Sequence, residues 1–348
     1  MYKERNRAMP SDTGFPVDAV YTWVDGSDST WKKKRNTALQ KIQQTKGVRI
    51  QQRSASEHRF RDNDELKYSL RSLEKCMPWI RNVYVITDEQ CPSWINQDNV
   101  IIIDHKDIFP RENTLPTFNS HSIELCQHRI EGLSDGFLSI NDDFILGRRL
   151  KKQDFFTKHG SPVIWAVKLS KRHKAGLLSD RYEEMTPHRA GETRARRMIL
   201  DGYGRYLPYR IRHYPRPMTR SAMQAIWERF PMEVNRTLSS PLRSTSDVAI
   251  HALFAYYCLA TGKGRLRLIN GIRQVGDALA GRLRYMGATV GDKHFDKKMN
   301  YIKLLKPLTF CFNDGDRTAE AHRRAVRDYF KELYPQPSKY EKQALGRD

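Results

Sequence analysis

Residues 1–150 alternate short apolar runs with segments of helical periodicity. The apolar runs are bounded by turn-forming residues and are therefore predicted to be β-strands, at residues 17–23, 83–86, 100–103 and 137–140. The second and third runs are apolar throughout, which is typical of parallel strands covered on both faces. This alternation predicts an α/β fold with a Rossmann-like, mostly parallel twisted sheet flanked by helices.

Helices are predicted between these strands. Residues 29–58 are polar and lysine-rich and are expected to form a helix followed by a loop. The next helix opens with Asp62 and Glu65, which are spaced as in a capping box, and ends at Pro78. Its apolar face repeats at helical spacing and comprises Leu66, Leu70, Leu73 and Met77. Residues 119–133 are predicted to be helical as well.

The second half of the chain is expected to be more helical. Thr219 is a candidate cap for one helix, Thr245 or Ser246 for another, and residues 318–335 are predicted to be a charged surface helix. No internal repeat or low-complexity linker divides the chain. The sequence therefore predicts a flexible N-terminal tail over residues 1–14, one domain over residues 15–335 and a polar C-terminal tail over residues 336–348.

Composition narrows the classes of function. The chain has 348 residues, a formal net charge of +21 and a sequence pI near 9.8, so its field attracts nucleic acid, anionic lipid and phosphate-rich substrates alike. Five scattered cysteines without a CxxC pair argue against a disulfide framework or a structural zinc site, and most are expected to be buried. Neither a secretory signal nor a run of roughly 18 apolar residues occurs, so we expect a cytoplasmic protein.

The acidic turn Asn141-Asp142-Asp143 follows directly after the fourth predicted strand. Ligands of open α/β sheets bind beyond the carboxyl ends of the strands. Two adjacent carboxylates there repel each other unless a cation compensates, and a hard divalent ion shared with substrate phosphates would do so. A solvated acidic turn is the plain alternative.

Other polar residues follow predicted strands or lie near predicted helix ends, where they could also contribute to a site. Asp25 and Gly26 follow the first strand, and Gly26 allows a close approach of the backbone. A second small acidic turn is formed by Asn313 and Asp314. Trp23 is a candidate for stacking on a base or for packing in the core, and Glu124 and His128 share one face of a predicted helix, with Arg129 beside them. His213 lies in a basic loop and is a candidate general base or phosphate ligand. Arg243 precedes a helix N-terminus, and Asp247 is a candidate helix-dipole partner.

Four blocks of the sequence resemble the conserved regions of the Stealth family, which includes bacterial capsule hexose-1-phosphate transferases and the animal N-acetylglucosamine-1-phosphotransferase. The first block is residues 17–28, and the second runs from Arg59 through residues 128–134 to Asp143. The third extends from His213 through Arg243 and Asp247 to Tyr257, and the fourth is residues 311–314. Gly315 and Asp316 follow where the family pattern varies. The compact chain resembles the bacterial form.

The resemblance implies a catalytic domain that transfers hexose-1-phosphate from a UDP-sugar to a hydroxyl of a growing capsular polysaccharide, forming a phosphodiester and UMP. It further implies that Asp142 and Asp143 bind Mg²⁺ or Mn²⁺, and that these two residues with Glu124, His213 and Arg243 are catalytic. The implied substrate-binding residues are Trp23, Asp25, Gly26, Arg61, Asn119, His128, Arg129, Asp247, Asn313 and Asp314. The expected partners are the UDP-sugar donor, the polysaccharide or oligosaccharide acceptor and, peripherally, the inner-membrane capsule assembly machinery.

Two other functions remain open at this point. A metal-dependent nucleotide-sugar glycosyltransferase would have the same sheet and acidic motif but would release UDP. A non-enzymatic polyanion-binding protein would account for the charge and for the Arg-rich residues 168–220, but no nucleic-acid-binding signature occurs, so no specific nucleic acid is expected. The absence of GxxxxGK[ST], GxGxxG, HExxH and GxSxG motifs argues against kinases, dehydrogenases, zincins and α/β-hydrolases.

Overall fold

The computed structural model describes residues 14–44, 56–111, 114–169, 180–269, 285–315 and 318–343. The N-terminal tail expected over residues 1–14 therefore lies outside the described residues, apart from Gly14. The loop expected after residue 44 and the position of Asp316 lie outside them as well.

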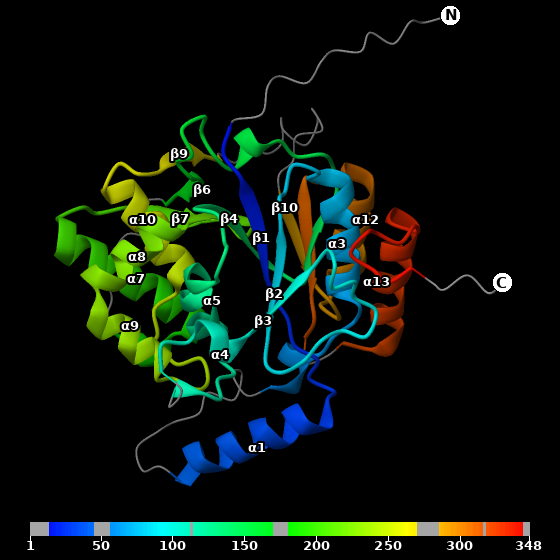
Figure 1. Ribbon diagram of the computed structural model, residues 1–348, viewed down its shortest axis with the longest axis horizontal. Coiled ribbons are helices and arrows are strands. Elements are labelled where there is room, and N and C mark those ends of the chain that lie inside the picture. The colour runs from blue at the N-terminus through cyan, green and yellow to red at the C-terminus, as the bar shows by residue number, and fades with distance from the viewer. Residues whose placement is uncertain are drawn as a thin grey trace, which may run out of the picture.

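A five-stranded sheet of order β3-β2-β1-β4-β8 lies at the centre of the molecule (Figure 1). Four of its strands are parallel, and the fifth, β8, pairs antiparallel with β4. The predicted α/β class with a mostly parallel sheet is confirmed. The strands are β1 (Val17–Thr22), β2 (Val83–Thr87), β3 (Ile101–Asp104), β4 (Gly136–Asn141) and β8 (Arg216–Thr219).

Successive side chains of the central strands enter two different hydrophobic cores, as the two-residue period of a strand requires. Val20, Tyr84 and Phe137 pack against the helices on the left of Figure 1, whereas Ala19 and Leu138 pack against α3 on the right. Burial of each large apolar side chain contributes about 1.5–3 kcal/mol. The sheet is therefore covered on both faces, and its strand ends are the places left for a site.

The edge strand β3 departs from expectation. Its apolar run predicted a strand covered on both faces, but Ile101 is 42% exposed. The physical reason is its position, because β3 is the last strand of the sheet and pairs with β2 alone.

The helices surround the sheet and two small three-stranded sheets (Figure 1). The small sheets are β10-β11-β5, from β5 (Phe144–Leu146), β10 (Tyr285–Thr289) and β11 (Thr309–Asn313), and β7-β6-β9, from β6 (Val163–Lys168), β7 (Tyr209–Ile211) and β9 (Arg265–Leu268). The helices are α1 (Ser29–Gln44), α3 (Glu65–Cys76), α4 (His105–Ile108), α5 (Ser120–Cys126), α7 (Pro187–Tyr203), α8 (Arg220–Arg229), α9 (Pro231–Leu238), α10 (Ile250–Ala260), α12 (Phe295–Leu305) and α13 (Glu320–Leu333).

Several helix starts differ from the sequence predictions. The residue before α3 is Asp64, in the left-handed conformation with φ of 67°, and the Glu65 carboxylate accepts from Asn63, so the predicted capping box does not form. Helix α10 begins at Ile250, beyond Thr245 and Ser246, and Thr219 precedes α8 without a side-chain cap bond. Side-chain spacing predicted helices near α3, α8 and α10, but for α3 the alternative polar partner of Glu65 replaced the predicted capping box.

The C-terminal residues 336–343 pack against the domain. Glu341 pairs with Arg71 at 2.7 Å, Tyr340 is buried, and Glu341 forms a β-bridge with Ile95. The segment that was expected to be a polar tail is thus tied to α3 and to the loop after β2 over these residues. Four of the cysteines are buried, as expected, and Cys91 is exposed.

Candidate active site

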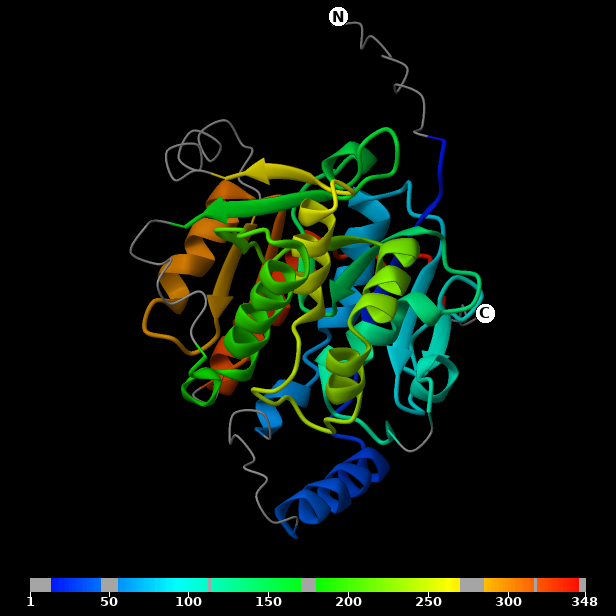
Figure 2. The same cartoon turned by 90° about the vertical axis from the view of Figure 1, so that its left-hand side faces the viewer.

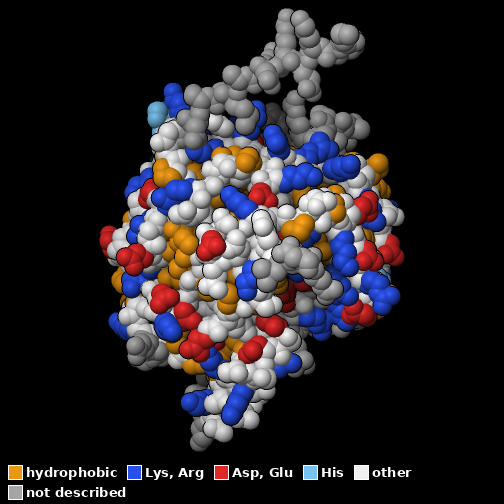
Figure 3. Space-filling view, turned by 45° about the vertical axis from the view of Figure 1, so that its right-hand side comes forward, with side chains coloured by type: hydrophobic (Ala, Val, Ile, Leu, Met, Phe, Trp, Pro, Cys, Tyr) orange, Lys and Arg blue, Asp and Glu red, His pale blue; other side chains and the backbone are white. Residues whose placement is uncertain are grey.

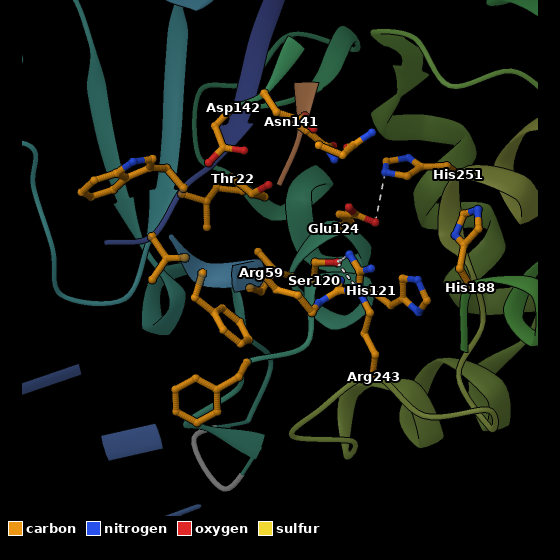
Figure 4. A pocket seen from close by; sticks show the side chains of 18 of the residues that line it. Thr22, Arg59, Ser120, His121, Glu124, Asn141, Asp142, His188, Arg243 and His251 are labelled. Carbon is orange, nitrogen blue, oxygen red and sulfur yellow. Dashed lines mark hydrogen bonds and ion pairs between the residues drawn. The ribbon is translucent and has the colours of Figure 1, made fainter. Parts of the chain in front are cut away.

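A cavity of about 580 Å³ lies beyond the carboxyl ends of β1 and β4, facing α5, α7 and α10. This is the position at which open α/β sheets bind ligands. Figure 4 shows Asp142 and Thr22 on the sheet side, His251 and His188 on the opposite side, and Glu124 between them. The five residues predicted to be catalytic, Asp142, Asp143, Glu124, His213 and Arg243, all line this cavity.

The turn after β1 positions one wall of the cavity. The Gly26 amide donates to the Phe60 carbonyl at 2.7 Å, and a Cβ on Gly26 would lie 2.1 Å from that oxygen, so only glycine fits. Asp25 accepts from the amide and hydroxyl of Ser27. Asp25 and Gly26 do not line the cavity themselves. They fasten the segment that brings Arg59 and Arg61 to it.

Four carboxylates gather on the sheet side of the cavity. Burial, followed by repulsion from Asp143, Glu65 and Asp62, raises the pKa of Asp142. Burial likewise raises the pKa of Glu65 to about 7 and that of Asp143 to about 6. Trp23 lies beside this group and donates from Nε1 to Asp62 at 3.2 Å. Burial therefore disfavours the charged forms of these carboxylates, and a bound cation would favour them.

These side chains fit a divalent cation. Asp143 Oδ1 is buried with no hydrogen-bond partner among the described residues, and Asp142 next to it offers carboxylate oxygens, which hard cations prefer. Asp143 also lies with His213 and Cys311 in a group whose ligand atoms are all within 4.8 Å of one another. Asp143 could therefore bind a cation together with the Asp142 carboxylate, or together with the His213 imidazole and the Cys311 thiol.

We expect the buried carboxylates of the metal-free protein to contribute less to its stability as the pH rises from about 5 to about 8. Folding raises the pKa values of Glu65 and Asp143, so in this window the native state holds protons that the unfolded state has lost. Their contribution to the free energy of unfolding then falls with pH, whereas the contribution of buried histidines with lowered pKa values, such as His213 and His251, rises. MgCl₂ should offset the repulsion, and should raise the melting temperature by at least about 2 °C more at pH 8 than at pH 5. Thermal unfolding with NaCl of equal ionic strength as control measures this; equal shifts at both pH values would contradict it.

A basic group centred on Arg216 adjoins the carboxylates, because Arg216 lies on β8 next to β4. Its Nη2 donates to His213 Nδ1 at 2.9 Å, and its Nη1 reaches Asn141 Oδ1 at 3.4 Å. Because a guanidinium only donates, His213 Nδ1 is an acceptor and its Nε2 carries the hydrogen. Burial and Arg216 lower the pKa of His213, so the ring is neutral. His213 is therefore arranged as a hydrogen-bond donor at Nε2.

Glu124 and His251 form a buried pair, with Oε2 and Nε2 3.0 Å apart. Burial opposes ionisation of Glu124, but His251, Arg216 and His121 together hold its pKa well below the usual range. Burial and Arg216 lower the pKa of His251 to about 4. The pair therefore carries one negative charge at neutral pH, in the middle of the cavity.

Arg243 lies on the loop before α10 and donates from Nε to Ser120 Oγ at 2.9 Å (Figure 4). Behind it, the buried Asp247 accepts from Asn119 Nδ2 and from the Ser244 amide, both at 2.8 Å. Asn119 and Asp247 do not line the cavity; they hold the loops that do. With Arg59 and Arg216, Arg243 supplies guanidinium groups suited to phosphate oxygens.

Of the six predicted site residues that do not line the cavity, Asp25, Gly26, Asn119 and Asp247 support its walls, whereas His128 and Arg129 have other contacts. His128 was expected to share the cavity-facing side of a helix with Glu124, but α5 ends at Cys126, and His128 packs against Trp227 instead. Arg129 donates to the Ile108 carbonyl at 2.6 Å. Neither residue lines the cavity. Asn313 and Asp314 do, and Asp314 pairs with Arg61 at 2.6 Å.

Several lining residues were not predicted from the sequence as site residues. Arg216 stood three positions after His213 in a basic stretch, and Glu65 was interpreted as a helix cap. His251 lies on an apolar helix where nothing in the pattern distinguishes it. Further examples are Arg59, His121, His188 and Glu192, which line the cavity, and Asp62, which contacts Trp23 beside it.

Comparisons with known proteins match four separate regions of the chain. The family models for Stealth conserved regions 1, 2, 3 and 4 match residues 15–43, 59–164, 212–260 and 305–347 in that order. The chain belongs to the Stealth family. Each of the four regions contributes residues to the cavity.

Curated relatives are named exopolysaccharide phosphotransferases. SCO6021 of Streptomyces coelicolor is 36% identical over 95% of this chain and 58% of its own length. CpsY of Mycobacterium tuberculosis is 30% identical over 95% of this chain and 59% of its own length. The chain thus spans little more than half of these relatives. A solved galactosyltransferase, LgtC in complex with donor and acceptor sugar analogs, aligns over 92% of this chain and 96% of its own with 11% identity and a TM-score of 0.43.

Among the described residues, no helix combines the length and the apolar character needed to cross a membrane. Figure 3 shows one face of the molecule on which Lys and Arg side chains are interspersed with Asp and Glu. The high net charge is therefore spread over this face instead of forming a single basic patch.

Proposed function

We propose that this chain transfers hexose-1-phosphate from a UDP-sugar to a hydroxyl of a growing exopolysaccharide, forming a phosphodiester and UMP. The observation that carries the proposal is the gathering of carboxylates and guanidinium groups in one cavity. Phosphoryl transfer needs charge neutralisation and alignment more than covalent chemistry from the protein. Membership of the Stealth family and the names of the relatives support the same reaction.

In this reaction the acceptor oxygen bonds to the β-phosphorus, and the bond from that phosphorus to the oxygen bridging it to the α-phosphorus breaks. UMP leaves with the bridging oxygen, and the sugar keeps its bond to phosphate. Asp142 and Asp143 would hold Mg²⁺ or Mn²⁺, which neutralises developing phosphate charge when bound. Arg216 and Arg243 would donate to phosphoryl oxygens.

Proton transfer falls to the buried pair in the centre of the cavity. Glu124 and His251, 3.0 Å apart, would take the proton of the acceptor hydroxyl. His213 is assigned a different role, because its Nδ1 is occupied by Arg216 and its Nε2 already carries hydrogen. It would donate to a phosphoryl oxygen.

The released nucleotide tests the proposal. The protein is incubated with UDP-N-acetylhexosamine, Mg²⁺ and an oligosaccharide acceptor, with EDTA in a parallel reaction. We expect metal-dependent UMP and a product that carries an additional phosphodiester. Release of UDP would instead identify a glycosyltransferase and overturn the proposal. The formal charge of +21 suits an acceptor that gains one negative charge per added unit, and attachment to the inner-membrane assembly machinery is proposed on the same ground.

A further inference from the structure

One part of the cavity wall lies outside all four matched regions. Of the described residues that line the cavity, three fall in the interval between regions 2 and 3: His188, Glu192 and Ile211. Every other lining residue belongs to a matched region. The shared regions therefore supply the reaction chemistry, and this interval adds a surface that the family models do not describe.

Helix α7 carries His188 and Glu192 on one face, because residues four positions apart lie one turn above the other. Its start is fixed by Thr186, whose hydroxyl accepts from the Arg189 amide, and by Pro187 in the first turn. The helix lies beside α10 (Figure 2). A Cβ on Gly191 would lie 2.7 Å from the Ala249 amide nitrogen, so glycine permits a backbone contact that brings α7 up to the cavity.

Glu192 has the features of a ligand group. Its side chain is 21% exposed and faces the cavity, and the nearest basic atom, His188 Nε2, is 3.7 Å from its Oε1. No described residue donates a hydrogen bond to it. A carboxylate with free acceptor capacity beside an imidazole can bind two neighbouring hydroxyl groups of a sugar.

The direction of phosphoryl transfer indicates whether the sugar beside Glu192 belongs to the donor or to the acceptor. The attacking and leaving oxygens of a phosphoryl transfer are roughly in line. If the diphosphate binds at the carboxylate side, UMP leaves toward β1 and the acceptor enters from the opposite side. His188 lies on that opposite side, across Glu124 from Asp142 (Figure 4).

We propose that Glu192 and His188 form a subsite for the terminal sugar of the acceptor chain, with Glu192 accepting hydrogen bonds from two of its hydroxyl groups. This inference rests on the proposed function for its direction of transfer. It assigns acceptor choice to α7, and donor binding and chemistry to the four matched regions.

Steady-state kinetics of Glu192→Gln test the subsite. With UDP-N-acetylhexosamine and a phosphodiester-linked hexose tetrasaccharide, we expect the KM for the tetrasaccharide to rise about 10-fold to 100-fold, as for loss of a hydrogen bond to a charged group. The KM for the donor should stay unchanged. His188→Gln should shift the same KM in the same direction. Asp201→Asn, an exposed carboxylate on the same helix, is the control and should change nothing.

Direct binding separates this inference from the proposed function. Titration calorimetry measures the affinity of the tetrasaccharide for wild type and for Glu192→Gln without requiring turnover. Weaker binding by the variant supports the subsite even if the wild type releases no UMP. Equal tetrasaccharide affinity, or a rise in the KM for the donor instead of the acceptor, would overturn it.

Discussion

Replacing Asp143 with asparagine is expected to slow UMP release about 100-fold to 1,000-fold, because it removes one of two adjacent carboxylates that would hold the cation on the transferred phosphate. The change is nearly isosteric, so the fold should persist. Burial raises the pKa of Asp143 to about 6, so the native protein disfavours its charge. The variant should therefore unfold at a temperature no lower than wild type above about pH 6, while its response to MgCl₂ shrinks.

Loss of activity without loss of stability distinguishes a functional carboxylate from a structural one. UMP release and the melting temperature, both measured with and without MgCl₂, report on the two properties separately. Asp98→Asn, a change at an exposed carboxylate in the loop before β3, serves as the control and should leave both unchanged. Near-normal UMP release by Asp143→Asn would remove this residue from the reaction, whatever its effect on stability.

Asp142 and Asp143 were predictable because they follow directly from local pattern, whereas Glu65 and Asp62 were interpreted as a helix capping box. Runs such as 137–140 were long and apolar enough to be recognised as buried strands, and Asp142 and Asp143 stand at the end of one. Parallel strands bring their carboxyl ends to one edge, so residues after different strands meet there without any knowledge of the packing.

The basic group was less predictable because it depends on contacts between distant segments. Arg216 reaches the cavity because β8 pairs antiparallel with β4, with Arg216 opposite Ser139. Nothing in the local sequence specifies that pairing. His128 shows the converse error: the four-residue spacing from Glu124 held in sequence, but α5 ended at Cys126 and the chain turned away.

Arg216→Gln is the second change for which we expect a large effect, about 100-fold to 1,000-fold in kcat, as for loss of a main donor to developing charge. Arg216 is buried at the edge of the sheet and donates to both His213 and Asn141. Glutamine keeps much of the volume but loses the charge and the fork of parallel donors. Arg205→Gln, a change at an exposed arginine in the loop before β7, is the matched control.

The electrostatic consequence of Arg216→Gln gives a readout independent of activity. Arg216 contributes, after burial, to the lowered pKa values of His213 and His251. Its removal should therefore raise both pKa values, and it should raise that of Asp143, which the guanidinium now lowers. Titration of the histidine ring resonances by NMR measures the first two directly. Reduced activity with unchanged histidine pKa values would mean that the variant acts through altered packing, and would contradict the central electrostatic role assigned to Arg216.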